Sequence, residues 1–297
     1  MLSPFWNVFV ITLVLVNIFA CLWLVRFANR TKENVVGAGE ATGHVWDEDL
    51  VELNNPLPRW WLWMFYLSII FGLAYLVLYP GLGNFAGTLG WTQTGQHAEQ
   101  VATANAQYDP LFQRLAAREI TDLAKDPKAV TVGRRLFLNH CALCHGSDGQ
   151  GARGFPNLAD NAWQWGGDPA AIKASIMEGR NGLMPPWEAA LGGQEGVKQV
   201  TEYVLQLAGR DHDNELATAG KARFMLCAAC HGADGTGNPM LGAHDLTDPT
   251  WVHGASRGQI AQNIANGVGG VMPPHKEFLG EDKVHVVAAY VYSLSRR

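Results

Sequence analysis

Two long uncharged runs open the chain, and each is long enough to cross a membrane. No charged side chain occurs from Met1 to Val25, and a second uncharged run extends from Trp60 to Tyr79. Because a helix rises about 1.5 Å per residue, each run can span a hydrocarbon core of about 30 Å. The second run starts with tryptophans and ends with tyrosines, whose rings favour the headgroup level. The pattern predicts transmembrane helices at 1–28 and 60–80.

Each run has an alternative interpretation, which its flanks disfavour. A cleaved signal peptide has basic residues before its apolar core and a small-residue cleavage site after it. No Lys or Arg precedes the first run, and Phe27–Arg30 follows it. A buried core helix is the alternative for the second run, but aromatic residues at both ends are typical of a spanning helix. We therefore expect membrane lipid around both segments.

The basic residues between the runs predict the orientation. Basic side chains gather in or beside loop 29–59, whereas none follows the second run until Arg114. The positive-inside rule then places this loop in the cytoplasm of a bacterium. Both termini, and everything after residue 80, would lie on the periplasmic face of the inner membrane. A periplasmic linker at 81–130 should contain a helix that ends at Asp126-Pro127.

The remainder of the chain is an internal repeat of two helical units. Cys141–Gly146 matches Cys227–Gly232, and Met184-Pro-Pro matches Met272-Pro-Pro. The offset is 86 residues at the cysteines and 88 at the methionines. A Gly-x-x-x-Phe segment precedes each cysteine pair, and an apolar helix follows each methionine, around Tyr203 in the first repeat and around Tyr290 in the second. Units this small are marginally stable without a cofactor or staple.

Composition excludes several classes of protein. The net charge of −5 argues against a nucleic-acid-binding protein, which would present a basic face. Hydrophobic residues make up 48% of the chain, too many for a disordered protein. Four of the five cysteines belong to the two repeats and the fifth, Cys21, lies in the first apolar run, so a disulfide scaffold is a poor interpretation.

Each repeat contains Cys-x-x-Cys-His, the attachment motif of c-type haem. Two thiols at this spacing can add to the two vinyl groups of one porphyrin, and the following imidazole can bind the iron. A zinc knuckle or a redox-active cysteine pair is the alternative. A histidine directly after both pairs, on the oxidising side of a membrane, favours haem. We expect two covalently bound haem c groups, held by Cys141, Cys144 and His145 and by Cys227, Cys230 and His231.

The matched methionines are candidates for the remaining axial positions. Met184 follows His145 by 39 residues, and Met272 follows His231 by 41. A lone methionine more often fills a core, but these two stand in register, each before Pro-Pro. His/Met ligation fills both axial sites, so it favours electron transfer and leaves no open site for catalysis. The fold class is then all-α, with two N-terminal transmembrane helices and tandem class I cytochrome c domains at 131–210 and 211–297.

Several segments together resemble the dihaem subunit, subunit III, of cbb3-type cytochrome c oxidases. The resemblance covers essentially the whole chain and includes the two haem motifs. The segments that make it specific are Asn55–Trp61 (Asn-Pro-Leu-Pro-Arg-Trp-Trp), Tyr75–Asn84 (ending in Tyr-Pro-Gly-Leu-Gly-Asn), Gly154–Asp160 and Asp282–Ser295.

This resemblance implies a terminal respiratory oxidase that reduces oxygen to water and pumps protons. The chain itself would be a non-catalytic electron-entry subunit. It would accept electrons from a soluble or membrane cytochrome c and pass them toward a monohaem subunit and the haem–copper catalytic subunit. Those two partners would dock through the helices at 5–25 and 60–79.

Two details of the haem sites remain open from sequence. Spacing favours a methionine that serves its own unit, although some descriptions of the family pair Met184 and Met272 crosswise. Family members also use a proline carbonyl, here that of Pro156, to orient the proximal imidazole. The matching position in the second unit is near His244, which leaves the acceptor for His231 undecided.

Three other classes of protein remain as alternatives. A membrane-tethered dihaem shuttle would work alone and would not need two spanning helices with these flanks. The cytochrome subunit of a periplasmic dehydrogenase usually carries a different number of haems. A dihaem peroxidase needs one five-coordinate haem, so the second Met-Pro-Pro segment counts against it.

Overall fold

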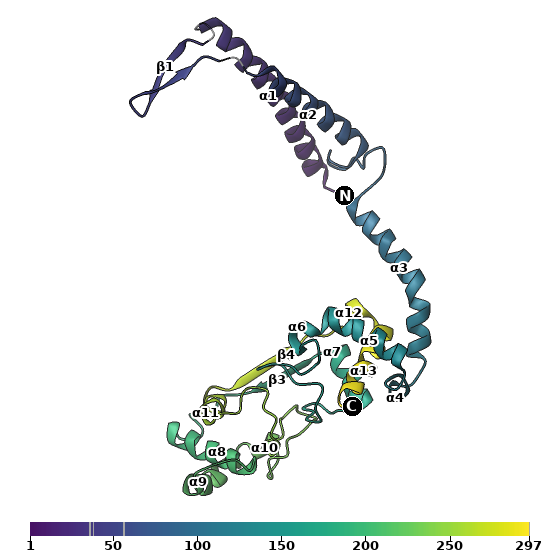
Figure 1. Cartoon of the computed structure of the whole chain (residues 1–297), viewed down its shortest axis with the longest axis vertical. Coiled ribbons are helices and arrows are strands. Elements are labelled where there is room, and N and C mark those ends of the chain that lie inside the picture. Colours follow the sequence, from purple (N-terminus) through teal and green to yellow (C-terminus); the bar gives the residue numbers. More distant parts are fainter. Residues whose placement is uncertain (36, 38, 56, 297) are drawn as a thin grey trace. The chain divides into compact units, whose positions relative to one another are not determined.

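The computed structural model describes the chain except residues 36, 38, 56 and 297 and the side chains of 29–35. It divides into two compact units, Met1–Ala106 and Gln107–Arg297, whose elements are labelled in Figure 1. The first unit contains α1 (Pro4–Val35), β1 (Ala41–Trp46), β2 (Leu50–Leu53), α2 (Arg59–Leu78) and the start of α3 (Gln93–Ala116).

Two helices of the first unit are long and apolar enough to cross a membrane. The segments that meet this criterion are Pro4–Ala28 of α1 and Arg59–Leu78, the whole of α2. No residue of α2, which the structure describes in full, is buried. A core helix of a soluble protein would be covered on at least one face, so this exposure decides against that interpretation.

Asn84 joins the beginning of α1 to the segment after α2. Its side-chain oxygen accepts a hydrogen bond from the Leu2 N–H at 2.7 Å, and its amide donates to the Leu2 carbonyl at 3.0 Å. The Asn84 N–H donates to Asn7 Oδ1 at 2.6 Å. Asn84 closes the Tyr-Pro-Gly-Leu-Gly-Asn segment, and these bonds hold that segment against the N-terminus.

The second unit is built from short helices and one pair of strands. Its elements are α4 (Ile120–Leu123), α5 (Pro127–His140), α6 (Ala142–His145), α7 (Pro169–Glu178), β3 (Arg180–Met184), α8 (Gln194–Leu207), α9 (Asn214–Phe224), α10 (Ala228–His231), α11 (Arg257–Asn266), β4 (Val268–Met272), α12 (Lys276–Leu279) and α13 (Glu281–Leu294). The prediction of an all-α chain is thus only roughly right, because the antiparallel pairs β1–β2 and β3–β4 are present.

One predicted boundary was wrong. We expected Asp126-Pro127 to end the linker helix, but α3 ends at Ala116 and Asp126 begins α5. The Asp126 carboxylate accepts a hydrogen bond from the Lys128 N–H at 3.0 Å, and Pro127 takes the first helical position. An aspartate followed by proline suits a helix start, because proline has no N–H to leave unpaired there.

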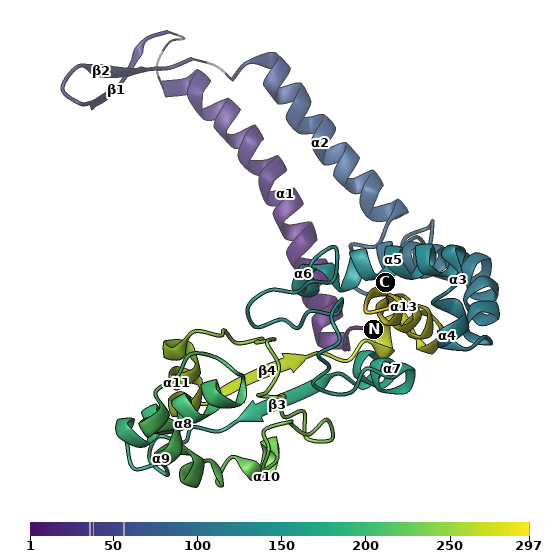
Figure 2. The ribbon, with the colours of Figure 1, turned by 60° about the horizontal axis from the view of Figure 1, so that its bottom comes forward.

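The helices of the second unit gather around two hydrophobic cores. The first lobe consists of α4–α7 with α12 and α13, around a core that includes Phe137, Ile176, Val287 and Tyr290. The second lobe consists of α8–α11, around a core that includes Val200, Tyr203, Phe224 and Ile264. In Figure 2, β3 and β4 run side by side between the two lobes.

This packing differs from the order of the repeats along the chain. The expected domains were 131–210 and 211–297, but α13 of the second repeat packs on α5 of the first, and α8 of the first repeat packs on α9 of the second. The physical reason is the β3–β4 ribbon. β3 leads the chain out of the first lobe after α7, and β4 pairs with it antiparallel, Arg180 opposite Met272, on the way back.

Close contact between these helices depends on two glycines. A Cβ added to Gly133 would lie 2.7 Å from Tyr290 Cβ, and one added to Gly220 would lie 2.0 Å from the Gln199 carbonyl oxygen. The rings beside these glycines also meet, Phe137 on Tyr290 at 5.2 Å and Phe224 on Tyr203 at 5.1 Å between centroids. Both lobes therefore use the same helix crossing.

Candidate haem-binding sites

Each Cys-x-x-Cys-His motif forms one short helical turn. The His145 N–H donates to the Cys141 carbonyl at 3.0 Å, and the His231 N–H donates to the Cys227 carbonyl at 2.9 Å. A glycine with positive φ ends each turn: Gly146 at 76° and Gly232 at 78°. The turn brings both thiols and the imidazole of one motif together, as attachment to a single porphyrin requires.

A backbone carbonyl holds each motif histidine by Nδ1. Nδ1 of His145 is 3.0 Å from the Pro156 carbonyl oxygen, and Nδ1 of His231 is 2.8 Å from that of His244. A hydrogen bond at Nδ1 leaves Nε2 to bind a metal and fixes the ring orientation. The acceptor that sequence left undecided for His231 is therefore present. It is a main-chain atom, so His244 supplies it as well as proline does.

Burial acts on the titrating groups of both motifs in the same way. It lowers the pKa of His145 and of His231, and the hydrogen bond that each imidazole donates to a backbone carbonyl opposes the shift. Burial, followed by the nearby second thiol of each motif, raises the pKa of Cys141 and of Cys227 to about 11. Because their pKa values are lowered, both imidazoles are favoured in the neutral form, which is the form that ligates metal.

The two Met-Pro-Pro segments lie in exchanged positions. Met272, from the second repeat, packs against the core of the first lobe, which also contacts Cys141. Met184, from the first repeat, packs against the core of the second lobe, to which Cys227 belongs. Each methionine is therefore in the same lobe as the cysteine motif of the other repeat.

Backbone contacts repeat this exchange on both sides. The His275 N–H, just after Met272-Pro-Pro, donates to the Ile176 carbonyl at 3.0 Å. The Trp187 N–H, just after Met184-Pro-Pro, donates to the Ile264 carbonyl at the same distance. A Cβ on Gly179 would lie 2.4 Å from the Met272 carbonyl oxygen, so α7 ends directly against that segment.

Tryptophan side chains provide a test of whether the second lobe fits a haem. Trp251 packs on the core of that lobe, and its Nε1 is buried with no hydrogen-bond partner among the residues that the structure describes. A buried donor of this kind normally has an acceptor, and a haem carries propionates that accept hydrogen bonds. Trp163 packs on the first core in the matching repeat position. Trp163 and Trp251 are 88 residues apart, the same offset as Met184 and Met272, but sequence alone gives them no role.

His275, His140 and Cys21 carry further nitrogen and sulfur atoms outside the two motif turns. His275 is buried, and its Nδ1 is 2.8 Å from the Pro273 carbonyl oxygen. His140 stacks edge-on against Phe278 at 5.3 Å. Cys21 is exposed on α1.

Family models match most of the chain. The N-terminal domain of cytochrome oxidase-cbb3, FixP, matches residues 38–86. Cytochrome C oxidase, cbb3-type, subunit III, matches 128–204 and again 215–291. The first match covers the hairpin and α2, and the other two contain the haem motifs.

Curated relatives are similar over nearly their full length. A cbb3-type cytochrome c oxidase subunit CcoP from Rubrivivax gelatinosus is 48% identical over 98% of this chain and 95% of the relative. The subunit FixP of Azorhizobium caulinodans is 38% identical over 88% of this chain and 95% of its own length. CcoP of Cereibacter sphaeroides is 38% identical over 87% and 95%. Two apolar helices precede two lobes that each contain a haem motif. Together with these matches, this arrangement shows that the chain belongs to the CcoP/FixP family, the cytochrome c electron-transfer subunits of cbb3-type cytochrome c oxidases.

Proposed function

We propose that the chain carries two covalent haem c groups, one in each lobe, and relays electrons from a cytochrome c donor toward the oxidase's monohaem and haem–copper subunits. The proposal is supported by the duplicated motif turns, each with two thiols and an oriented imidazole. When bound, haem c supplies an iron that cycles between ferrous and ferric states. The three other classes left open by sequence lose their support, because the chain belongs to an oxidase-subunit family.

We also propose crosswise axial ligation. His145 would share its haem with Met272, and His231 would share its haem with Met184. The single observation that supports this pairing is the packing of each Met-Pro-Pro segment on the core of the other repeat's lobe. It goes against the spacing argument, which favoured pairing within one repeat.

The protein's own residues would tune and protect these centres. A thioether is a neutral ligand that raises the potential of the iron relative to a second imidazole. The carbonyls of Pro156 and His244 would keep each imidazole in one orientation. Filled axial positions would leave no site for oxygen or peroxide, so this chain would relay electrons without a reaction of its own.

In the membrane, we propose two spans with loop 29–59 in the cytoplasm. Segment 81–130, both lobes and both termini would be periplasmic. The distribution of Lys and Arg supports this orientation. The hydrogen bonds that join Asn84 to Leu2 and Asn7 support two spans, because they hold the beginning of α1 and the segment after α2 together on one side.

Carbon monoxide binding in variants tests the ligand set. The reduced wild-type chain, purified in mild detergent, should carry two haems that survive a denaturing gel and should bind no carbon monoxide. Met272→Ala should open one haem to carbon monoxide. Adding Cys141→Ala and Cys144→Ala, which remove the first haem, should abolish that binding.

The reciprocal set provides the matched control. Met184→Ala combined with the same two cysteine substitutions should still bind carbon monoxide, at the haem of His231. If Met272→Ala binds carbon monoxide after loss of the first haem, pairing is within one repeat. Binding by the wild-type chain would contradict methionine ligation altogether.

A further inference from the structure

The hairpin formed by β1 and β2 has no supporting layer in the structure. Val45 pairs with Val51 and Trp46 with Leu50, across a turn in which Asp47 and Glu48 have positive φ. Both strands are fully described, and none of their residues is buried. An isolated two-stranded hairpin is marginally stable in water. Figures 1 and 2 both show it extending away from α1 and α2.

Apolar side chains are exposed on both faces of this hairpin. Successive residues of a strand point to opposite faces, so the Val45–Val51 pair and the Trp46–Leu50 pair lie on different sides. Trp46 is 64% exposed, Leu50 62% and Val45 56%. Val45, Val51 and Leu53 form an exposed apolar cluster on one face, and Trp46 with Leu50 forms another on the opposite face; exposed apolar clusters of this kind mark interaction sites.

The charge of the segment restricts what can cover it. Residues 37–58 contain five acidic side chains, those of Glu40, Asp47, Glu48, Asp49 and Glu52, and no Lys or Arg. Anionic lipid on the cytoplasmic leaflet would repel them. The cytoplasmic loops of membrane-spanning proteins, in contrast, are enriched in Lys and Arg.

We propose that the β1–β2 hairpin docks on a Lys/Arg-rich cytoplasmic loop of a neighbouring membrane-spanning subunit of the oxidase. The acidic turn would face the basic side chains, and the paired valines, with Leu53, would be covered by apolar residues of the same loop. Electrostatic complementarity would fix the register of this contact. The proposal rests on the orientation given under Proposed function and adds a contact outside the bilayer.

Photocrosslinking in native membranes tests the contact. The full chain carrying p-benzoylphenylalanine at Val51, assembled in the complex, should yield an adduct whose peptide comes from a Lys/Arg-rich loop of another subunit. The substitution Asp49→Lys should lower the adduct yield at least twofold. The matched control, Glu99→Lys on the exposed face of α3, makes the same charge change elsewhere and should leave the yield unchanged.

The outcomes separate this proposal from the one on which it rests. An adduct with lipid, with a soluble protein or with a segment that lacks Lys and Arg would overturn docking, as would no adduct. A Val51→Cys variant, made with Cys21→Ser, then reports orientation separately. If a membrane-impermeant maleimide added to intact spheroplasts labels it, the proposed orientation is wrong. If it is labelled only after lysis and denaturation in SDS, which also exposes a docked hairpin, the orientation stands, and only the crosslink decides whether the hairpin docks.

Discussion

Phe137 and Tyr290 come from different repeats, and their rings pack together in the first lobe with centroids 5.2 Å apart. Phe137 ends the Gly-x-x-x-Phe segment of α5, and Tyr290 is a buried tyrosine of α13. Tyr203, the tyrosine that follows Phe137 in its own repeat, instead meets Phe224. The pairing of these rings shows how the helices are exchanged, and it leads to the first two predictions.

Gly133→Ala should destabilise the first lobe by about 1–3 kcal/mol, the usual cost of overpacking a core. Its Cβ would lie 2.7 Å from both Tyr290 Cβ and the Val286 carbonyl oxygen, so α5 and α13 must separate. Denaturant unfolding of the haem-loaded chain measures this change. Gly258→Ala is the matched control, because nothing lies within 4 Å of its Cβ position on α11. A helical alanine there should be neutral or slightly stabilising.

Removal of residues 281–297 should damage the first lobe and spare the second. α13 supplies Val284, Val287 and Tyr290 to the first core, whereas the second core contains no residue after Ala265 among those described. Limited proteolysis of the haem-loaded chain should therefore cut near residues 120–180 first. Cleavage confined to 211–280 would instead support lobes that follow the order of the repeats.

Sequence could predict the parts of this fold that depend on local pattern. The apolar runs predicted both helices that are long and apolar enough to cross a membrane, and the Cys-x-x-Cys-His spacing indicated where the two motifs lie. The exchange could not be predicted, because Tyr203 and Tyr290 occupy equivalent helices and either can pack on a Gly-x-x-x-Phe segment. The β3–β4 ribbon was missed as well. β4 reads Val-Gly-Gly-Val-Met and has no polar alternation that indicates a strand.

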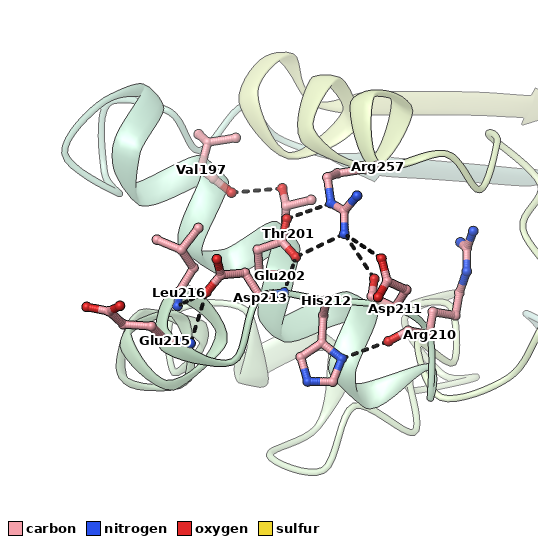
Figure 3. Close-up of polar contacts among 10 residues, drawn as sticks. All are labelled: Val197, Thr201, Glu202, Arg210, Asp211, His212, Asp213, Glu215, Leu216 and Arg257. Carbon is pink, nitrogen blue, oxygen red and sulfur yellow. Dashed lines mark hydrogen bonds and ion pairs between the residues drawn. The ribbon is translucent and has the colours of Figure 1, made fainter.

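The buried Glu202 carboxylate should stabilise the second lobe. As Figure 3 shows, it accepts hydrogen bonds from Arg257 Nε at 2.7 Å and from the Asp213 N–H at 2.9 Å. Arg257→Ala should destabilise the second lobe, because the buried Glu202 carboxylate loses its partner; water moderates the loss, since the Arg257 side chain is 52% exposed. Unfolding in urea, monitored by the tryptophan fluorescence of the second lobe, measures this loss of stability. Glu195→Gln on the exposed face of α8 is the control. An equal effect of both substitutions would contradict the assigned role.

Reporter fusions should reveal two spans. A reporter active only in the periplasm should be active after residue 85 and inactive near residue 45, since Asn84 lies beside the N-terminus and the basic residues flank the loop. The measurement is the reporter activity of membranes prepared from cells that express each fusion. The reverse pattern would refute the orientation, and activity at both positions would indicate a single span.

The exchanged packing also makes the second lobe an insertion within the first. Its helices, α8 to α11, come from one continuous stretch of chain, whereas the first lobe combines α4–α7 with α12 and α13. As the polypeptide is extended from its N-terminus, the second lobe can close from contiguous sequence. The first lobe, although its cysteines emerge earlier, must wait for the final helix. The order of motifs along the chain is therefore the reverse of the order in which their lobes can be completed during synthesis.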